Sequence, residues 1–143
     1  MISIGLLEHG EISAVTELWR KAGLAHPWND SAQDVARALA HPTNRIFVAR
    51  LDNEYLVGSI MVGFDGHRGW IYSLAVDPGQ QGLGIGKKLV ECAEAWLRSE
   101  GAPVVRLLVE GGNAKVAGFY EACGFERGDF ITFGKRLADA SSS

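Results

Sequence analysis

One run of glycines constrains the fold of this chain more than any other feature of its sequence. Residues 76–89 read Val-Asp-Pro-Gly-Gln-Gln-Gly-Leu-Gly-Ile-Gly-Lys-Lys-Leu and join a strand-like apolar segment to an amphipathic segment with helical spacing. The first N–H groups of such a helix lack backbone partners, and the helix dipole adds partial positive charge there. Glycines at 82, 84 and 86 remove side chains that would keep a ligand away from the backbone. The run therefore predicts an anion site, suited to a phosphate or pyrophosphate.

Length and composition limit what surrounds this turn. A chain of 143 residues predicts a single domain, here over residues 1–137, followed by a frayed polar tail over residues 138–143. The net charge of −3 argues against nucleic acid or an anionic membrane as the main partner. Two cysteines and four scattered histidines predict neither a disulfide framework nor a metal site. With no signal-peptide pattern at the start, we expect a cytoplasmic protein.

The order of the predicted elements places the turn inside a mixed sheet. Alternating apolar residues predict strands at 2–6, 46–51, 55–64 and 70–76, and helical spacing predicts helices at 12–22 and, after a cap at Asp30 or Ser31, up to Pro42. The predicted elements after the turn are a helix over 85–97, a strand over 104–109, a helix between Asn113 and Gly124 and a hairpin over 125–137. Since strand–helix–strand crossovers are right-handed, strands 70–76 and 104–109 should be parallel. We expect an α/β fold, with a mixed sheet covered on both faces by helices.

Three glycine motifs compete for the turn. A Walker A loop needs glycine and a hydroxyl side chain where this chain has Gln81 and Lys88. A Rossmann fingerprint needs a glycine where Lys87 stands, and a strand near the start of a βαβ unit. The third motif has the form Gln-x-x-Gly-x-Gly, and Gln81, Gly84 and Gly86 match all three of its fixed positions.

With this motif the chain resembles the GNAT superfamily of acyl-CoA-dependent N-acyltransferases. The family's second signature is an asparagine heading a helix, a tyrosine seven residues later and a Gly-Phe pair. Asn113, Tyr120 and Gly124-Phe125 match it. The order of elements also resembles the family over residues 2–137, including two parallel strands that splay apart at the cofactor site.

The resemblance implies that the chain binds acetyl-CoA. The backbone of residues 81–87 would wrap the pyrophosphate, and strand residues 74–76 would pair with the pantetheine arm where the two strands splay. The Asn113 side chain would contact the same arm. The implied cofactor contacts are Leu74, Ala75, Val76, Gln81, Gly82, Leu83, Gly84, Ile85, Gly86, Lys87 and Asn113.

The resemblance also implies direct transfer of an acetyl group to a primary amine in a ternary complex, with Tyr120 as general acid. A phenol with a pKa near 10 keeps its proton at neutral pH and can give it to the leaving thiolate. Where relatives carry a glutamate as general base, this chain has Trp70 and Leu108. The remaining candidates for the base are a chain of waters and the side chains of Asp65, His67 and Glu110.

The acceptor side is the least determined part of the site. Candidate acceptor contacts are Trp28, Asn29 and Asp30 between the first two helices, and Asp65, His67 and Arg68 in a hairpin loop. Segments 27–30 and 65–69, with Tyr72, also resemble a bacterial branch of the family typified by the protein called YpeA. Small amines, amino acids, polyamines, antibiotics and protein amines all stay open as acceptors, and so does a homodimer.

Two other classes of function stay open at this point. A non-catalytic acyl-CoA-binding or sensing module would keep the glycine turn, and the absence of glutamates at Trp70 and Leu108 slightly favours it, whereas Tyr120 favours the enzyme. A nucleotide-binding module would bind ATP or NAD more tightly than coenzyme A. Release of thiol from acetyl-CoA in the presence of amines separates the enzyme from both.

Overall fold

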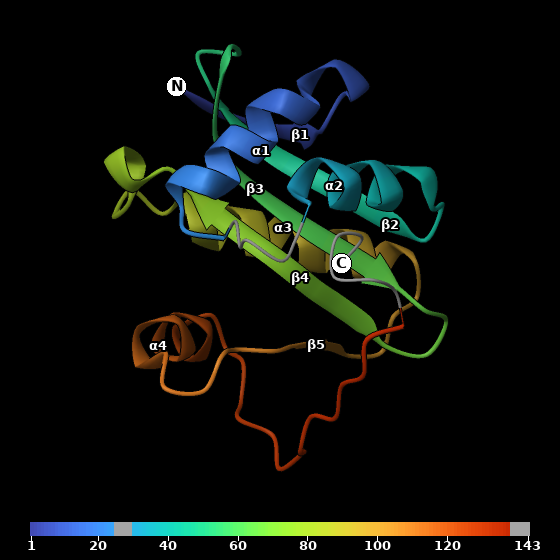
Figure 1. Ribbon diagram of the computed structural model, residues 1–143. Helices are drawn as coiled ribbons and strands as arrows, with labels where there is room; N and C mark the ends of the chain where they lie inside the picture. The colour runs from blue at the N-terminus through green and yellow to red at the C-terminus, as the bar shows by residue number, and fades with distance from the viewer. Residues whose placement is uncertain (25–29, 138–143) are drawn as a thin grey trace.

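The computed structural model describes residues 1–24 and 30–137 and contains one mixed sheet (Figure 1). The first four strands pair antiparallel with their neighbours in chain order, and the fourth pairs parallel with the fifth. This confirms the predicted mixed sheet and the parallel crossover. Trp28, Asn29 and the tail at 138–143 lie outside the described residues. The strands, in spatial order, are β1 (Ile2–Leu6), β2 (Asn44–Leu51), β3 (Tyr55–Phe64), β4 (Gly69–Val76) and β5 (Val105–Leu107).

Helices cover both faces of this sheet, as the sequence predicts. Buried side chains of α1 (Ile12–Lys21) and α2 (Ser31–Ala40) pack against one face, and those of α3 (Ile85–Ser99) pack against the other. The remaining helix, α4 (Ala114–Ala122), lies beside β5 and joins the core of α3 (Figure 1). Two short 3-10 turns, η1 (His9–Glu11) and η2 (Pro78–Gln80), complete the elements. No helix in the described ranges is long and apolar enough to cross a membrane.

The pairing of β4 with β5 ends half-way along β4. Their pairing runs from Gly69 opposite Val105 to Ile71 opposite Leu107 and stops there. Residues 74–76 of β4 pair with β3 alone, so the other edge of this half of β4 has no strand beside it in the described structure. β5 is consequently shorter than the predicted strand, and the expected splay is present.

An irregularity in β4 lies where the two strands separate. Met61 of β3 is opposite Ser73, whereas the next residue, Val62, is opposite Ile71. Tyr72 is therefore one residue more than β3 can match, which defines a β-bulge. A bulge changes the side to which the following side chains point. As a result, Tyr72 and Ser73 both lie on the face that carries α1 and α2.

The predicted C-terminal hairpin is wrong. Residues 125–137, as the structure describes them, form neither strand nor helix. Gly128 and Gly134 interrupt the alternation that a strand needs, and β5 offers only a short template for pairing. The segment instead crosses over β5, where the Arg106 guanidinium lies 4.7 Å from the centre of the Phe130 ring.

Candidate active site

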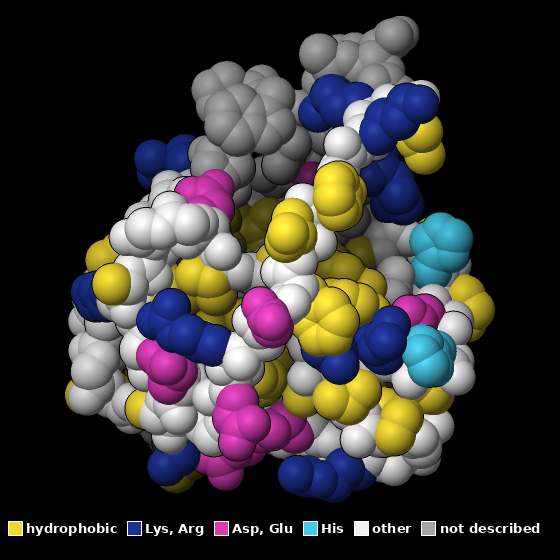
Figure 2. All heavy atoms as spheres, turned by 90° about the horizontal axis from the view of Figure 1, so that it is seen from below, with side chains coloured by type: hydrophobic (Ala, Val, Ile, Leu, Met, Phe, Trp, Pro, Cys, Tyr) yellow, Lys and Arg dark blue, Asp and Glu magenta, His cyan; other side chains and the backbone are white. Residues whose placement is uncertain are grey.

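A cavity of about 1140 Å³ lies beside β5, between α4 and the C-terminal segment. Seen from this side, the surface is hollowed, and hydrophobic side chains gather in the hollow with charged side chains around it (Figure 2). The cavity is bounded by the stretch that leads from β5 to α4, by one face of α4 and by residues 124–133. Polar side chains that line it include Arg68, Arg106, Glu110, Asn113 and Tyr120.

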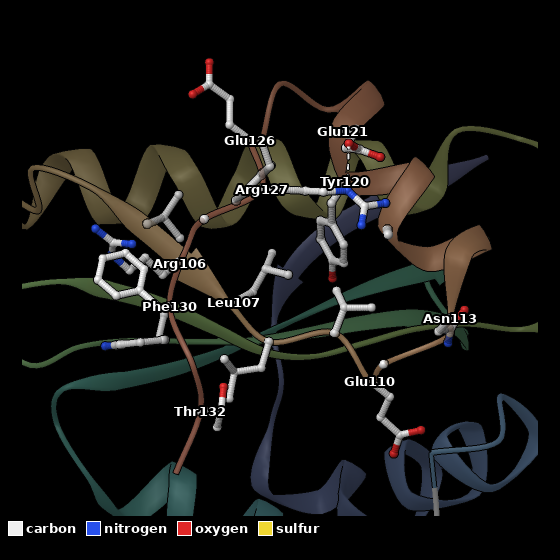
Figure 3. A pocket seen from close by; sticks show the side chains of 18 of the residues that line it. Arg106, Leu107, Glu110, Asn113, Tyr120, Glu121, Glu126, Arg127, Phe130 and Thr132 are labelled. Atoms are coloured by element: carbon white, nitrogen blue, oxygen red, sulfur yellow. Dashed lines mark hydrogen bonds and ion pairs between the residues drawn. The ribbon is translucent and has the colours of Figure 1, made fainter.

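Tyr120 is the buried phenol of this cavity. Only 8% of the residue is exposed, and its hydroxyl group points into the hollow toward the chain that leaves β5 (Figure 3). The rings of Phe119 and Phe125 meet it edge-on, with centres 5.1 and 5.5 Å away. Burial, and to a lesser degree the neighbouring Cys123 thiol, raise the pKa of Tyr120 to about 12. The phenol is therefore neutral throughout the physiological range and holds a proton at the cavity wall.

Asn113 is the N-cap of α4, and the cap uses its carbonyl oxygen. Its Oδ1 accepts a hydrogen bond from the Val116 N–H at 3.2 Å, and its own N–H donates to the Glu110 carbonyl at 3.1 Å. The cap occupies one end of the amide, and an asparagine amide also carries two N–H donors. A structural cap and a contact with a ligand in the cavity are therefore compatible.

Two glycines with left-handed backbone, Gly82 and Gly84, and the side chain of Asp77 shape the glycine turn. Gly82 and Gly84 have φ values of +84° and +79°, which other residues rarely adopt. Gly84 is the N-cap of α3, and among the described residues no side chain caps this end of the helix. Asp77 closes the turn before it, because its Oδ1 accepts a hydrogen bond from the Gly79 N–H at 2.8 Å. The start of α3 therefore has N–H groups that no side chain of the described residues caps.

Gly86 serves a different purpose from the other two glycines of the motif. A β-carbon at this position would stand 3.2 Å from Cζ of Phe119 and 3.7 Å from Cγ2 of Val76. The absence of a side chain therefore lets α4 approach the first turn of α3. Gly86 connects the turn to the helix that carries Tyr120.

Asp65, a candidate for the base and for an acceptor contact, is a loop-closing residue. Its carboxylate accepts hydrogen bonds from the N–H groups of Arg68 at 2.6 Å and His67 at 2.8 Å, and from Trp70 Nε1 at 3.2 Å. The bonds from Arg68 and then His67 are the main reasons that the pKa of Asp65 lies below its ordinary value. Neither Asp65 nor His67 lines the cavity with Tyr120, whereas Arg68 does.

Of the first group of acceptor candidates, the structure describes Asp30. Its Oδ1 accepts a hydrogen bond from the Gln33 N–H at 3.1 Å, so Asp30 and not Ser31 caps α2. A smaller cavity of about 300 Å³ lies on this side of the sheet, and Asp30 is not among its lining residues. Its wall comes instead from α1, from α2 and its C-cap, and from β2, β3 and the bulge of β4.

Sequence reasoning missed several residues of the larger cavity. Arg106 of β5 and Glu126 of the C-terminal segment line it, and Arg106 Nε is buried with no hydrogen-bond partner in the part of the chain that the structure describes. No motif marks these residues, since their place depends on the path of the C-terminal segment across β5. Glu110 was a candidate and does line the cavity, whereas the family's glutamate position is occupied by the exposed Leu108.

Comparison with known proteins identifies the class of this one. Residues 12–125 match the Acetyltransferase (GNAT) family, so the chain belongs to that family. A relative from Pectobacterium atrosepticum, acetyltransferase ECA0875, is 39% identical over 138 residues, which cover 96% of this chain and 97% of the relative. These matches confirm the acetyltransferase interpretation over the binding-module interpretations.

Solved structures of low sequence identity share the fold. The aminoglycoside acetyltransferase AAC(6')-Iy, in complex with a bisubstrate analogue, superposes with a TM-score of 0.82 at 16% identity over 96% of this chain and 99% of that one. PaiA N-acetyltransferase from Thermoplasma acidophilum, in complex with coenzyme A, gives a TM-score of 0.78 at 20% identity over 92% and 93% of the two chains. The ribosomal-protein-S18-alanine N-acetyltransferase from Escherichia coli gives 0.78 at 25% identity over 90% of this chain and 79% of that one.

Proposed function

We propose that this protein transfers an acetyl group from acetyl-CoA to a primary amine by direct attack in a ternary complex. The observation that carries the proposal is the free edge of β4 at residues 74–76, which leads directly into the glycine turn at the start of α3. A free strand edge can pair with an extended, amide-bearing chain, and a glycine-capped helix N-terminus can bind phosphate. Coenzyme A carries both groups in one molecule.

The residues of the turn fit a pyrophosphate. The N–H groups of residues 81–87 would bind its oxygens, and the left-handed glycines at 82 and 84 leave their approach open. Lys87 adds positive charge beside them. Leu74, Ala75 and Val76 would bind the pantetheine amides through the backbone, and the Asn113 side chain would contact the same arm. When bound, acetyl-CoA supplies the activated acetyl group.

We infer that Tyr120 donates a hydrogen bond to the leaving sulfur and then passes it the proton. A phenol with a pKa of about 12 is a weaker acid than an ordinary thiol, with a pKa of about 8.5, so the transfer is uphill unless the sulfur becomes more basic. Burial of the sulfur acts in this direction, because burial disfavours a thiolate. Burial raises the pKa of the nearby Cys123 thiol in this way.

Among the proposed bases, Glu110 is better supported than Asp65. The Asp65 carboxylate is committed to the hairpin loop, and the pKa of that carboxyl is lowered, which weakens it as a base. Glu110 lines the cavity of Tyr120 and lies on the exposed stretch between β5 and α4. An exposed carboxylate can draw the proton from an ammonium acceptor through water.

The experiment that tests the proposal is thiol release from acetyl-CoA with a panel of primary amines. We expect release that depends on an amine, and coenzyme A binding that is tighter than that of ATP or NAD in calorimetric titration. Release without dependence on any amine would contradict the proposal. The YpeA-like branch and a homodimer are parts of the proposal that rest on the sequence resemblance, and a cytoplasmic location is a part that rests on composition and cysteine usage.

A further inference from the structure

The outer edge of β5 is an open strand edge. β5 is the last strand of the sheet and pairs with β4 alone. The Val104 carbonyl, just before β5, accepts a hydrogen bond from the Gly69 N–H of β4 at 2.8 Å. Because the peptide groups of a strand alternate in direction, the N–H and C=O groups of Val105 and Leu107 point away from β4. Within residues 1–24 and 30–137, no backbone group pairs with them on that side.

This edge opens into the cavity that contains Tyr120. Val105 and Leu107 line that cavity together with Tyr120 and Glu110, the proposed acid and base. The residues proposed to bind acetyl-CoA through their backbone, 74–76 and 81–87, do not line it. The cavity therefore offers its space to the acceptor, with the proposed acid and base in its wall.

The cavity is larger and longer than a small amine needs. Its volume of about 1140 Å³ exceeds the range of roughly 300–1,000 Å³ that is usual for small-molecule sites. In Figure 3, Arg106 and Phe130 lie toward one end of the cavity and Glu110 and Tyr120 toward the other. Four residues of extended chain, such as those from Arg106 to Glu110, span up to roughly 14 Å. The cavity thus has room for several residues of an extended polymer.

The walls of the cavity complement a polypeptide. A small amine would leave the outward backbone groups of β5 unpaired, whereas an extended peptide supplies a C=O for each N–H and an N–H for each C=O. Apolar side chains that are open to solvent also line the cavity. Leu108, Ile131 and Phe133 are 69%, 82% and 90% exposed, and they can pack against alternate side chains of an added strand.

We propose that the acetyl acceptor is the N-terminal amine of a polypeptide, whose first residues add a strand to the outer edge of β5, antiparallel to it. The proposal rests on the acetyl transfer proposed above. The amine lies beside Glu110 and Tyr120, and the peptide runs back toward Val105. The amine nitrogen bonds to the thioester carbonyl carbon and the C–S bond breaks. One proton leaves the nitrogen and one goes to the sulfur, so the products are an N-acetylpeptide and coenzyme A with a free thiol.

A second copy of this chain is the other occupant that an open strand edge admits. A strand from a second copy would fill the cavity that Tyr120 and Glu110 line, and the acceptor would then have no access to either residue. The position of these two side chains in the cavity therefore favours a peptide acceptor.

The first test varies the length of the acceptor. Alanine amide, Ala-Thr-Ala amide and Ala-Thr-Ala-Thr-Ala amide have the same N-terminal amine and no lysine, and thiol release from acetyl-CoA gives kcat/KM for each. We expect kcat/KM to rise at least about 10-fold from alanine amide to the pentapeptide, as for a gain of two or more backbone hydrogen bonds. Equal values would overturn this inference and leave the proposed acetyl transfer standing. Absence of thiol release with every amine would overturn the acetyl transfer, and this inference with it.

The second test asks whether the peptide pairs as a strand. Successive N–H groups of a strand point to opposite sides, so an N-methyl group on the third or on the fourth residue of the pentapeptide blocks one side only. We expect one of these two peptides to lose about 5-fold or more in kcat/KM and the other to lose little. Equal losses would contradict strand pairing. The protein in this test is wild type, so its folding is not in question.

The third test changes the edge of β5 itself. Val105→Pro removes an outward N–H at the first residue of β5, a position where proline is tolerated. Leu6→Pro is the matched control at the opposite edge of the sheet, because the Leu7 N–H donates to the Ile46 carbonyl and the Leu6 N–H therefore points away from β2. We expect Val105→Pro to lower kcat/KM for the pentapeptide by about 2- to 10-fold relative to this control.

Equal values of kcat/KM in the two proline variants would overturn the inference. A wild-type dimer in light scattering that Val105→Pro dissociates, together with no dependence on peptide length, would assign the edge to a second copy and would overturn it as well.

Discussion

Gly86 of α3 lies directly against Phe119 of α4, so that a β-carbon at Gly86 would stand 3.2 Å from Cζ of the Phe119 ring. The turn proposed to hold phosphate and the helix proposed to hold the general acid meet at this contact. Tyr120 follows Phe119 in the chain, and their rings pack edge-on. The position of the Tyr120 hydroxyl in the cavity therefore depends on how closely these two helices approach.

Replacement of Gly86 by alanine should loosen this contact. The added methyl group overpacks the interface, at a cost of about 1–3 kcal/mol, whereas alanine in a helix gains up to about 1 kcal/mol over glycine. We expect Gly86→Ala to be less stable than Gly118→Ala in denaturant unfolding, because nothing lies within 4 Å of a β-carbon at Gly118 of α4. Equal stabilities of the two variants would show that the helices do not meet as described.

Gly84→Asp should weaken coenzyme A binding. The left-handed backbone at Gly84, with a φ of +79°, is strained for any other residue, and a carboxylate there repels a pyrophosphate. Gly101→Asp at the opposite end of α3, where φ is +86°, imposes the same kind of strain and charge far from the turn. Calorimetric titration should show loss of affinity in the first variant and near-normal affinity in the second. A similar loss in both would point to strain alone.

Tyr120→Phe should lower turnover and leave coenzyme A affinity nearly unchanged. A general acid typically contributes roughly 10²–10⁴-fold, and phenylalanine keeps the packing against the neighbouring rings. Tyr55→Phe is the control, since Tyr55 is 60% exposed and lies outside the cavity. If steady-state turnover of Tyr120→Phe matched that of the control, Tyr120 would not be the acid.

The raised pKa of Tyr120 also predicts how stability depends on pH. Its pKa is near 10 in the unfolded chain and about 12 in the folded one, so the folded state keeps the proton where the unfolded state loses it. The contribution is complete below about pH 10 and is lost as the pH rises toward 12. It amounts to about 2–3 kcal/mol at 1.36 kcal/mol for each pKa unit. Wild type should lose stability between pH 10 and 12 more steeply than Tyr120→Phe, and parallel curves would contradict the burial.

Glu110→Gln and Asp65→Asn separate the two proposed roles of carboxylates. Glu110 lines the cavity, so its neutralisation should lower kcat by at least about 10-fold. Asp65 holds the hairpin loop through the N–H groups of His67 and Arg68, so its neutralisation should weaken the loop and affect kcat less. Rate profiles against pH for both variants provide the measurement. A larger loss of kcat in Asp65→Asn than in Glu110→Gln would reverse the assignment.

Helix ends and the direction of strand pairing could be predicted from local patterns in the sequence. Gly84 begins a helix and Gly124 ends one, with the left-handed backbone that their positions suggest. Asn113 caps α4 as expected, and α2 is capped by Asp30, one of the two residues predicted for that cap. The parallel order of β4 and β5 follows from the handedness of the crossover between them. These features depend on a few neighbouring residues, and a single sequence is enough to predict them.

Other features depend on contacts between distant segments, and the sequence does not show them. The bulge at Tyr72 is set by how β4 pairs with β3, and nothing near Tyr72 in the chain announces it. The packing role of Gly86 depends on Phe119, which lies far along the chain. The path of residues 125–137 depends on the short β5, so alternation alone predicted strands that are not formed.

Transfer of labelled acetyl from acetyl-CoA to a purified amine is the most direct test of the central claim. We predict that wild type forms a labelled N-acetyl product in step with thiol release, and that Tyr120→Phe forms it far more slowly while still binding coenzyme A. Tight coenzyme A binding by wild type without labelled product on any amine of the panel would contradict the account.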